Sequence, residues 1–356
     1  MYHAQPLPRQ VDVAALLHRE NAVSAYDICL RFEEFVSTEQ DTERIISARI
    51  LGYLLLHPSS HGSLSEIVKE IHSCSEDYDA LHNLGQAFLN YFIRAFRKYQ
   101  GRTPFTSDHL SRPSFDQQRL LPKASIKEAP KNHSTAKAQA LLRDGYRCAV
   151  TGAYDTLAQD MLNDELADPQ VWLVDTECAH IVPESTYFNV NTDNSQEASS
   201  KKDYVASVLT VLSRFGYDVD KLNGPKVHSL YNVMTLEHNV HNRFDRLQLW
   251  LEETMEQDMA NCYRVTAVRS GFTPMMRERV MFTTPDPERL PLPSPQLLAL
   301  HAACAKVANL SGAADYLDKL DRELETTDVL ACDGGAAEVL NHAIASLAGR
   351  GINAGA

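Results

Sequence analysis

The sequence of 356 residues lacks the features that mark several common classes of protein. It has no Cys-x-x-Cys pair, so a structural zinc site is not expected. It has no Gly-rich phosphate-binding loop and no serine-nucleophile motif. Its longest strongly apolar run, around residues 50–56, is too short for a bilayer core of ~30 Å. Its first residues lack a basic segment followed by an apolar run. We therefore expect no membrane partner and an intracellular location, nuclear or cytoplasmic, rather than secretion.

The cysteines and the composition indicate an ordinary globular interior. The chain is 44% hydrophobic and 23% charged, which is typical of globular proteins. Its seven cysteines are odd in number and scattered, which indicates reduced, mostly buried thiols. At ~100–200 residues per domain, the length allows two or three domains.

Positive charge is scarce overall and unevenly distributed. The 34 Lys and Arg residues are outnumbered by 47 Asp and Glu, giving a formal net charge of −13. Residues 1–92 carry 6 Lys/Arg against 13 Asp/Glu, a net of −7, whereas residues 93–147 carry 12 against 4, a net of +8. An acidic chain repels a polyanion, so any contact with nucleic acid is expected to be local and to use the basic segment.

This basic segment has four prolines between residues 101 and 133, so it is expected to be mostly non-helical there. Two interpretations stay open: a solvated linker, or a strip of cations that binds phosphate groups beside the module that follows. In the second interpretation the nucleic-acid-binding residues are Arg112, Arg119, Lys123 and Lys127.

Two short stretches carry the residues with chemical potential, and the first is residues 177–184. The β-forming residues at 171–174 and 179–182 predict a strand, which Pro183 ends because proline removes a hydrogen-bond donor. This leaves His180 at the end of a strand.

The second stretch is residues 232–245. Its apolar residues 233–236 predict a short strand, and residues 237–245, which contain no Gly or Pro, predict a helix. On that helix His241 and Asp245 are one turn apart and share a face. Imidazole and carboxylate both coordinate divalent cations such as Mg, Mn, Zn or Ni.

Together these stretches resemble the HNH endonucleases, whose ββα-metal module is named after such a His, Asn and His. The resemblance implies that His180 activates the water that attacks phosphorus. It implies that Asn232, nine residues before the helix histidine, orients the loop carrying His180. It also implies a metal site at His241, with Asp245 as a further ligand. The implied cofactor is a divalent ion (Mg, Mn, Ni or Zn), and the implied partner is nucleic acid, DNA rather than RNA.

The chain departs from the family in one respect. Many members have Asp or His directly before the catalytic histidine as a metal ligand, and this chain has Ala179. It is closer to a branch written Ala-His-Ile-x-Pro, then Asn, then His-x-x-Phe-Asp, which is common in fungal proteins. Glu177 or Asp175 are candidates for the missing ligand, but strand side chains alternate, so only some of them point the same way as His180.

Three neighbouring residues have competing interpretations. His238, one turn before His241, is either a further ligand or a surface histidine. Asp245 is either a ligand or a partner of Arg243 or Arg246. Cys178 shares a strand face with His180, but a nucleophilic thiol would need an activating partner of its own.

The remaining sequence predicts helices on both sides of this module. Apolar spacing predicts helices within residues 13–99, with a stop at residues 57–60. The other expected elements are a helix at 203–215, strands at 247–251, 263–268 and 279–283, and helices at 296–307, 313–325 and 336–347.

We therefore predict an α+β fold in which a ββα-metal (HNH) module with flanking strands lies between N-terminal and C-terminal helical regions. The expected parts are a helical domain (1–100), a basic Pro-containing linker (101–140), the nuclease-like domain (141–284) with an insertion (184–231), and a helical C-terminal region (285–356). The helical regions are candidates for binding a protein partner.

The predicted function is that of a metal-dependent HNH endonuclease that hydrolyses phosphodiester bonds. The alternative is a catalytically degenerate HNH fold that acts as a binding or assembly module.

Overall fold

The computed structural model describes most of the chain with several gaps. The described residues are 2–9, 20–97, 130, 132–158, 172–183, 208, 210–218, 222, 224–254, 260–272 and 276–326. They divide into two compact units, which we describe separately. One draws on Met1–Thr103, Val190–Val219 and Leu300–Ala356, and the other on Pro104–Asn189 and Asp220–Ala299.

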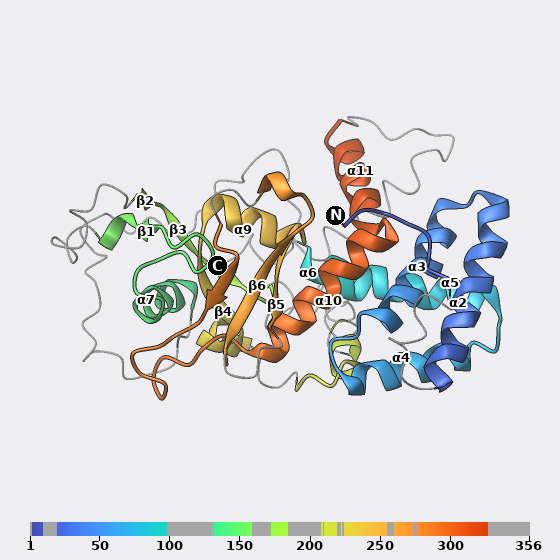
Figure 1. The fold of residues 1–356 in the computed structure, drawn as a ribbon, viewed down its shortest axis with the longest axis horizontal. Coiled ribbons are helices and arrows are strands. Elements are labelled where there is room, and N and C mark those ends of the chain that lie inside the picture. The colour runs from blue at the N-terminus through green and yellow to red at the C-terminus, as the bar shows by residue number, and fades with distance from the viewer. Residues whose placement is uncertain are drawn as a thin grey trace, which may run out of the picture. The chain divides into compact units, whose positions relative to one another are not determined.

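The first unit is helical, as predicted. Its N-terminal helices are α2 (Glu20–Glu39), α3 (Thr42–Leu56), α4 (His61–Ser73) and α5 (Tyr78–Phe88) (Figure 1). A π-helical turn, η1 (Leu89–Ile93), continues α5 into α6 (Arg94–Phe96). Near the other end of the chain lie α10 (Pro295–Ser311) and α11 (Ala313–Thr326). The helices predicted at 203–215 and 336–347 fall partly and wholly outside the described residues.

Local sequence signals explain where these helices begin and end. The Asp41 carboxylate caps α3 by accepting the backbone N–H of Arg44. The residue before Pro58 is biased away from helical backbone, and α3 ends at Leu56. Ser60 and Ser63 then form a capping box that starts α4.

A buried cation ties the end of α6 to α11 within this unit. The Arg97 side chain is 4% exposed and forms ion pairs with Asp318 and, at 2.6 Å, with Asp321. Both carboxylates are on one face of α11, three residues apart, so a single guanidinium can bind both.

The second unit contains the predicted strand, strand and helix. Strand β3 (Thr176–His180) pairs antiparallel with β4 (Val233–Glu237), and His180 lies opposite Val233. Glu237 ends β4 and is also the N-cap of α9 (His238–Asp245). The helix therefore follows the hairpin without a loop, and the predicted ββα order is confirmed.

Further strands flank this hairpin. The antiparallel sheet β5 (Leu249–Glu253), β6 (Cys262–Ala267) and β7 (Arg279–Met281) confirms the three strands predicted after the helix. The first begins two residues later than predicted, because Leu247 has φ 58° and turns the chain. A short parallel pair, β1 (Tyr154–Asp155) and β2 (Leu173–Val174), completes the described strands.

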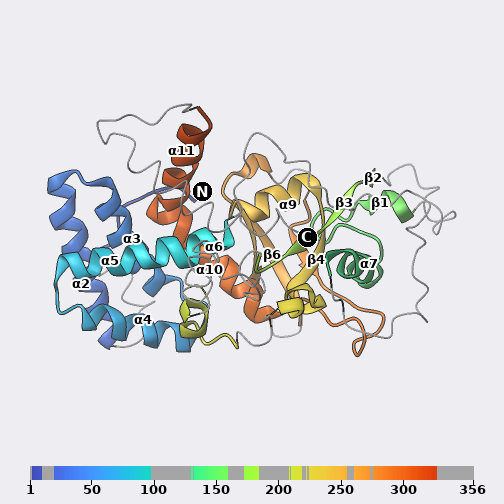
Figure 2. The same cartoon turned by 180° about the vertical axis from the view of Figure 1, so that it is seen from behind.

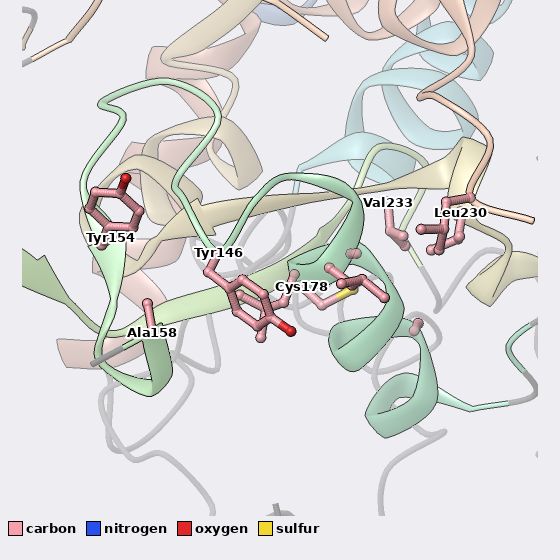
Figure 3. Packing of buried hydrophobic residues seen from close by; sticks show 11 residues of the cluster. Tyr146, Tyr154, Ala158, Cys178, Leu230 and Val233 are labelled. Atoms are coloured by element: carbon pink, nitrogen blue, oxygen red, sulfur yellow. The ribbon is translucent and has the colours of Figure 1, made fainter. Parts of the chain in front are cut away.

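Helix α7 (His133–Arg143) covers one side of the hairpin (Figure 2). It begins inside the segment 101–140 that the sequence indicates as a linker, because Asn132 and Thr135 form a capping box there. Figure 3 shows the buried cluster that this packing creates. Its members include Tyr146, Tyr154, Ala158, Cys178, Leu230 and Val233. Cys178 is thus a core residue at 2% exposure.

Within the described residues, no single helix is long and apolar enough to cross a membrane. Helices α10 and α11 reach that length and composition only as a pair, bent by 77°.

Candidate active site

A buried ion pair fixes the start of β4, the strand that leads into the site. The Arg143 side chain is fully buried, pairs with Asp144, and donates to the carbonyls of Leu230 at 2.6 Å and Val233 at 2.8 Å. Asp144 accepts the backbone N–H of Thr235 at 2.9 Å. Arg143 and Asp144 therefore hold the backbone on both sides of Asn232 from α7.

Asn232 connects this anchored segment to the loop after His180. Its side chain is fully buried, and its Oδ1 accepts the N–H of Val182 at 2.9 Å. Its Nδ2 donates to the carbonyls of Val182 at 3.0 Å and Val227 at 2.9 Å. The Asn232 carbonyl also accepts the N–H of Ile181 at 2.8 Å. Asn232 therefore joins the start of β4 to the loop after His180, and its role in catalysis stays a prediction.

His180 is the last residue of β3 and is 9% exposed. Its Nε2 lies 3.2 Å from Nδ1 of His228, with the two ring centroids 5.3 Å apart and the rings at 68°. The ring of His133, at the start of α7, has its centroid 5.7 Å from that of His180. His180 therefore belongs to a group of three histidines drawn from three separate segments.

His228 is not among the site residues predicted from the sequence. It lies 48 residues from His180 and ends the 3₁₀ helix η8 (Gly224–His228), where no local pattern marks it. Burial, followed by the nearby charge of His133, lowers the pKa of His228 to about 4. His228 is consequently uncharged at neutral pH.

The helix histidine contacts carboxylates at both ring nitrogens. Its Nδ1 lies 2.5 Å from Oε2 of Glu177 on β3, and its Nε2 lies 3.3 Å from Oδ1 of Asp245. The side chains of His241 and Asp245 are 13% and 8% exposed, whereas that of Glu177 is 42% exposed. The structure thus brings His241 and Asp245 together as predicted from the helix spacing, and adds Glu177.

These contacts shift both pKa values. For Glu177, the hydrogen bond from His241 outweighs burial and lowers the carboxyl pKa to about 2. For His241, burial disfavours the charged ring, but hydrogen bonds to Asp245 and Glu177 outweigh it and raise the pKa to about 9. In the absence of a cation His241 is therefore protonated at neutral pH and donates through both nitrogens.

His238 also contacts Glu177. Its Nδ1 lies 2.9 Å from Oε1 of Glu177, and its Nε2 lies 3.0 Å from the side-chain amide of Asn242. The His238 side chain is 63% exposed. The same carboxylate therefore bridges two histidines of α9, His238 and His241.

Alternation along β3 explains why Glu177 reaches α9. Glu177 and Ala179 are two residues apart in the strand, so they share a face, and His180 begins from the opposite face. Glu177 therefore points the way a ligand at position 179 would point. Asp175, the other candidate, precedes the strand and accepts the Thr156 hydroxyl at 3.1 Å.

The donor chemistry around His241 fits a divalent cation. Imidazole nitrogen with carboxylate oxygen is a set that Mg, Mn, Ni or Zn accepts in different proportions. A cation that binds His241 would take the place of the proton on one ring nitrogen, and Asp245 stands at Nε2 whereas Glu177 stands at Nδ1. Among the residues that the structure describes, however, no three His, Cys, Asp or Glu side chains form a ready-made metal-binding group.

The predicted nucleic-acid contacts lie elsewhere in the chain. Arg112, Arg119, Lys123 and Lys127 fall outside the described residues, as does much of the insertion 184–231. Their roles stay predictions.

Strands β3 and β4 pair antiparallel, and β4 leads directly into helix α9. His180 ends β3, Asn232 directly precedes β4, and His241 lies on α9, which is the arrangement of a ββα module of the nuclease type. Residues 148–252 match the family model described as HNH endonuclease. The chain therefore contains an HNH endonuclease domain, and the resemblance and the predicted α+β fold are confirmed. No curated protein and no solved structure matches the chain.

Proposed function

We propose that this protein is a metal-dependent endonuclease that hydrolyses phosphodiester bonds of nucleic acid, DNA rather than RNA. The observation that carries the proposal is the buried side chain of Asn232, which bonds to the loop after His180. The strand that follows Asn232 leads into α9, on which His241 contacts two carboxylates. A base and a cation-binding group thus stand on one module. That both address the same phosphate is part of the proposal.

In this mechanism neutral His180 is the general base and takes a proton from the attacking water. Asn232 does not touch the substrate and keeps the loop after His180 in place. Its three side-chain hydrogen bonds are all buried, so losing one of them would leave an unsatisfied group inside the fold.

His241, through Nε2, and Asp245 would hold the divalent cation, and Glu177, at Nδ1 of His241, would orient the imidazole ring. The cation, when bound, supplies positive charge to the scissile phosphate and the leaving oxygen.

The substrate side of the proposal rests on the charge pattern. We assign phosphate binding to Arg112, Arg119, Lys123 and Lys127, because the net charge of the rest of the chain opposes a polyanion. We also propose that the helical unit binds a protein partner. We propose in addition that the protein acts inside the cell.

The alternative function is a degenerate module that binds or assembles without cutting. One observation favours it: position 179 is a fully buried alanine, so it offers no ligand of its own.

A plasmid-nicking assay distinguishes the two functions. Wild-type protein is incubated with Mg, Mn or Ni, with and without EDTA. The proposal expects nicking that EDTA abolishes, and a loss of ~10²–10⁴ in rate for His180→Ala, the usual contribution of a general base. His61→Ala, an exposed histidine of the helical unit, is the matched control and should cut like wild type. Absence of nicking with every metal would favour the binding module.

A further inference from the structure

We infer that His228 is a positioning residue for His180: its Nδ1 accepts the Nε2–H of His180, which places the lone pair of His180 on Nδ1, the nitrogen that takes the proton from water. The inference rests on the proposed nuclease function. It adds a residue that the HNH motif does not contain and that comes from the insertion between His180 and Asn232.

The contact itself is direct. Nε2 of His180 and Nδ1 of His228 are 3.2 Å apart, which is within hydrogen-bond distance. The two residues are 9% and 7% exposed, so water competes little for these nitrogens. A buried hydrogen bond of this kind fixes both the rotation of the ring and the position of its proton.

One amide group sets the spacing of the pair. Asn232 binds both backbone groups of Val182, two residues after His180, and also the carbonyl of Val227, directly before His228. The two histidines are thus held from their neighbouring residues by the same buried side chain. Asn232 therefore positions the pair as well as the loop after His180.

The two nitrogens in contact restrict the proton positions. If His180 donates through Nε2, then a neutral His228 carries its own proton on Nε2. If His228 donates through Nδ1 instead, a neutral His180 must also be protonated on Nδ1, where it could not accept a proton from water. The Nε2–H form is the more stable tautomer of a neutral imidazole side chain in water, so the first arrangement uses the preferred form of both residues.

The surroundings keep His228 uncharged, as an acceptor must be. Burial and the neighbouring His133 of α7 both disfavour a proton on a second nitrogen of His228. In the step that follows, the water oxygen bonds to phosphorus as the bond from phosphorus to the leaving oxygen breaks. The water proton goes to Nδ1 of His180, and the leaving oxygen takes a proton from solvent. The imidazolium so formed keeps its Nε2–H bonded to His228.

The test measures the tautomer directly. Long-range ¹H–¹⁵N spectra of the full-length protein labelled with ¹⁵N-histidine report which nitrogen of His180 carries the proton. The inference expects Nε2–H in wild type and a mixture of tautomers in His228→Leu. It expects His228→Asn, whose side-chain oxygen stands close to the place of Nδ1, to restore Nε2–H.

Kinetics supply the second readout. In His228→Leu, kcat should fall about 10–100-fold, the range seen when a group that orients a functional imidazole is lost. KM should stay unchanged, and His228→Asn should recover most of kcat. A His180 protonated on Nδ1 in wild type would overturn the inference, even if the leucine variant failed to fold. So would a leucine variant with unaltered tautomer and kcat. If wild type shows Nε2–H and the leucine variant loses it, but no protein cuts nucleic acid, the hydrogen bond stands and the nuclease proposal fails.

Discussion

Oε2 of Glu177 lies 2.5 Å from Nδ1 of His241, and the Glu177 side chain is on the same face of β3 as Ala179. In an extended strand every second side chain points the same way, so a carboxylate two residues earlier can reach what a ligand at position 179 would reach. A glutamate side chain is longer than that of the aspartate that many family members have at position 179, and this length covers the two-residue distance along the strand.

The first prediction follows from this arrangement. Glu177→Gln keeps the size of the side chain but removes the charge, so the affinity for Mn or Ni, measured by titration calorimetry, should fall by about 10-fold or more. Asp175→Asn, which removes a nearby carboxylate bonded to Thr156 instead, should bind the metal like wild type. Equal affinities for Glu177→Gln and wild type would show that Glu177 has no part in metal binding.

A pH-dependent stability of the metal-free protein is the second prediction. The pKa of His241 is raised from 6.5 to about 9, so its contribution to stability is complete below pH 6.5 and is lost as the pH rises to 9. The pKa of Glu177 is lowered from 4.5 to about 2, so its contribution is complete above pH 4.5 and is lost toward pH 2. The ion pair should therefore stabilise most between pH 4.5 and 6.5.

Urea unfolding in the presence of EDTA measures this effect. The difference in free energy of unfolding between wild type and His241→Gln should shrink when the pH is raised from 6 to 9. His238→Gln is the control for losing a histidine contact to Glu177, because His238 contacts the same carboxylate from a largely exposed position. A difference that is constant over this range would contradict the assigned pair.

The hairpin and helix of the site could be predicted because their signals are local. A β-forming run before Pro183, another at residues 233–236, and a helix without Gly or Pro each occupy fewer than ten residues. The fixed spacing of His241 and Asp245 on that helix likewise predicts their contact. These predictions need no knowledge of distant parts of the chain.

Contacts between residues that are far apart in the sequence could not be predicted from such local signals. His228 meets His180 from a segment 48 residues away, where Asn232 binds the backbone at both Val182 and Val227. The sequence offered both Glu177 and Asp175 as replacements for the ligand missing at position 179. The structure distinguishes them, because β3 begins at Thr176, so Glu177 lies in the strand and Asp175 lies before it. Both outcomes depend on tertiary pairing, which a single sequence does not specify.

The third prediction concerns Arg143. Its guanidinium is fully buried and bonds to Asp144 and to backbone carbonyls on both sides of Asn232. Arg143→Met would leave the Asp144 carboxylate without its buried partner, which typically costs about 3–5 kcal/mol. Arg289→Met, at a 59% exposed side chain with a weak surface pair, should change the free energy of unfolding by less than about 1 kcal/mol. Similar urea midpoints for the two variants would contradict the anchoring role of Arg143.

The last prediction concerns the basic segment and separates phosphate binding from a passive linker. If the segment holds nucleic acid, affinity should come mainly from phosphate contacts, because it contains many cations and no recognisable base-reading helix. Each contact on duplex DNA releases counterions, so log affinity should fall against log salt with a slope of about −0.9 per contact. A quadruple serine variant should flatten that slope and weaken binding to different sequences alike. The residues to be replaced are Arg112, Arg119, Lys123 and Lys127.

A control variant must remove the same charge elsewhere, because the net charge of −13 alone affects binding to DNA. Four exposed cations with surface ion pairs serve this purpose, since such pairs contribute little stability. They are Arg31, Lys69, Arg289 and Lys319. Fluorescence anisotropy over a range of salt concentrations gives the slope of log affinity against log salt for each variant. The slope of the quadruple serine variant should be shallower than that of this control by an amount equal to about four phosphate contacts. If both variants bind DNA with the same slope, the basic segment is a linker, and the insertion at 184–231 becomes the surface to mutate next.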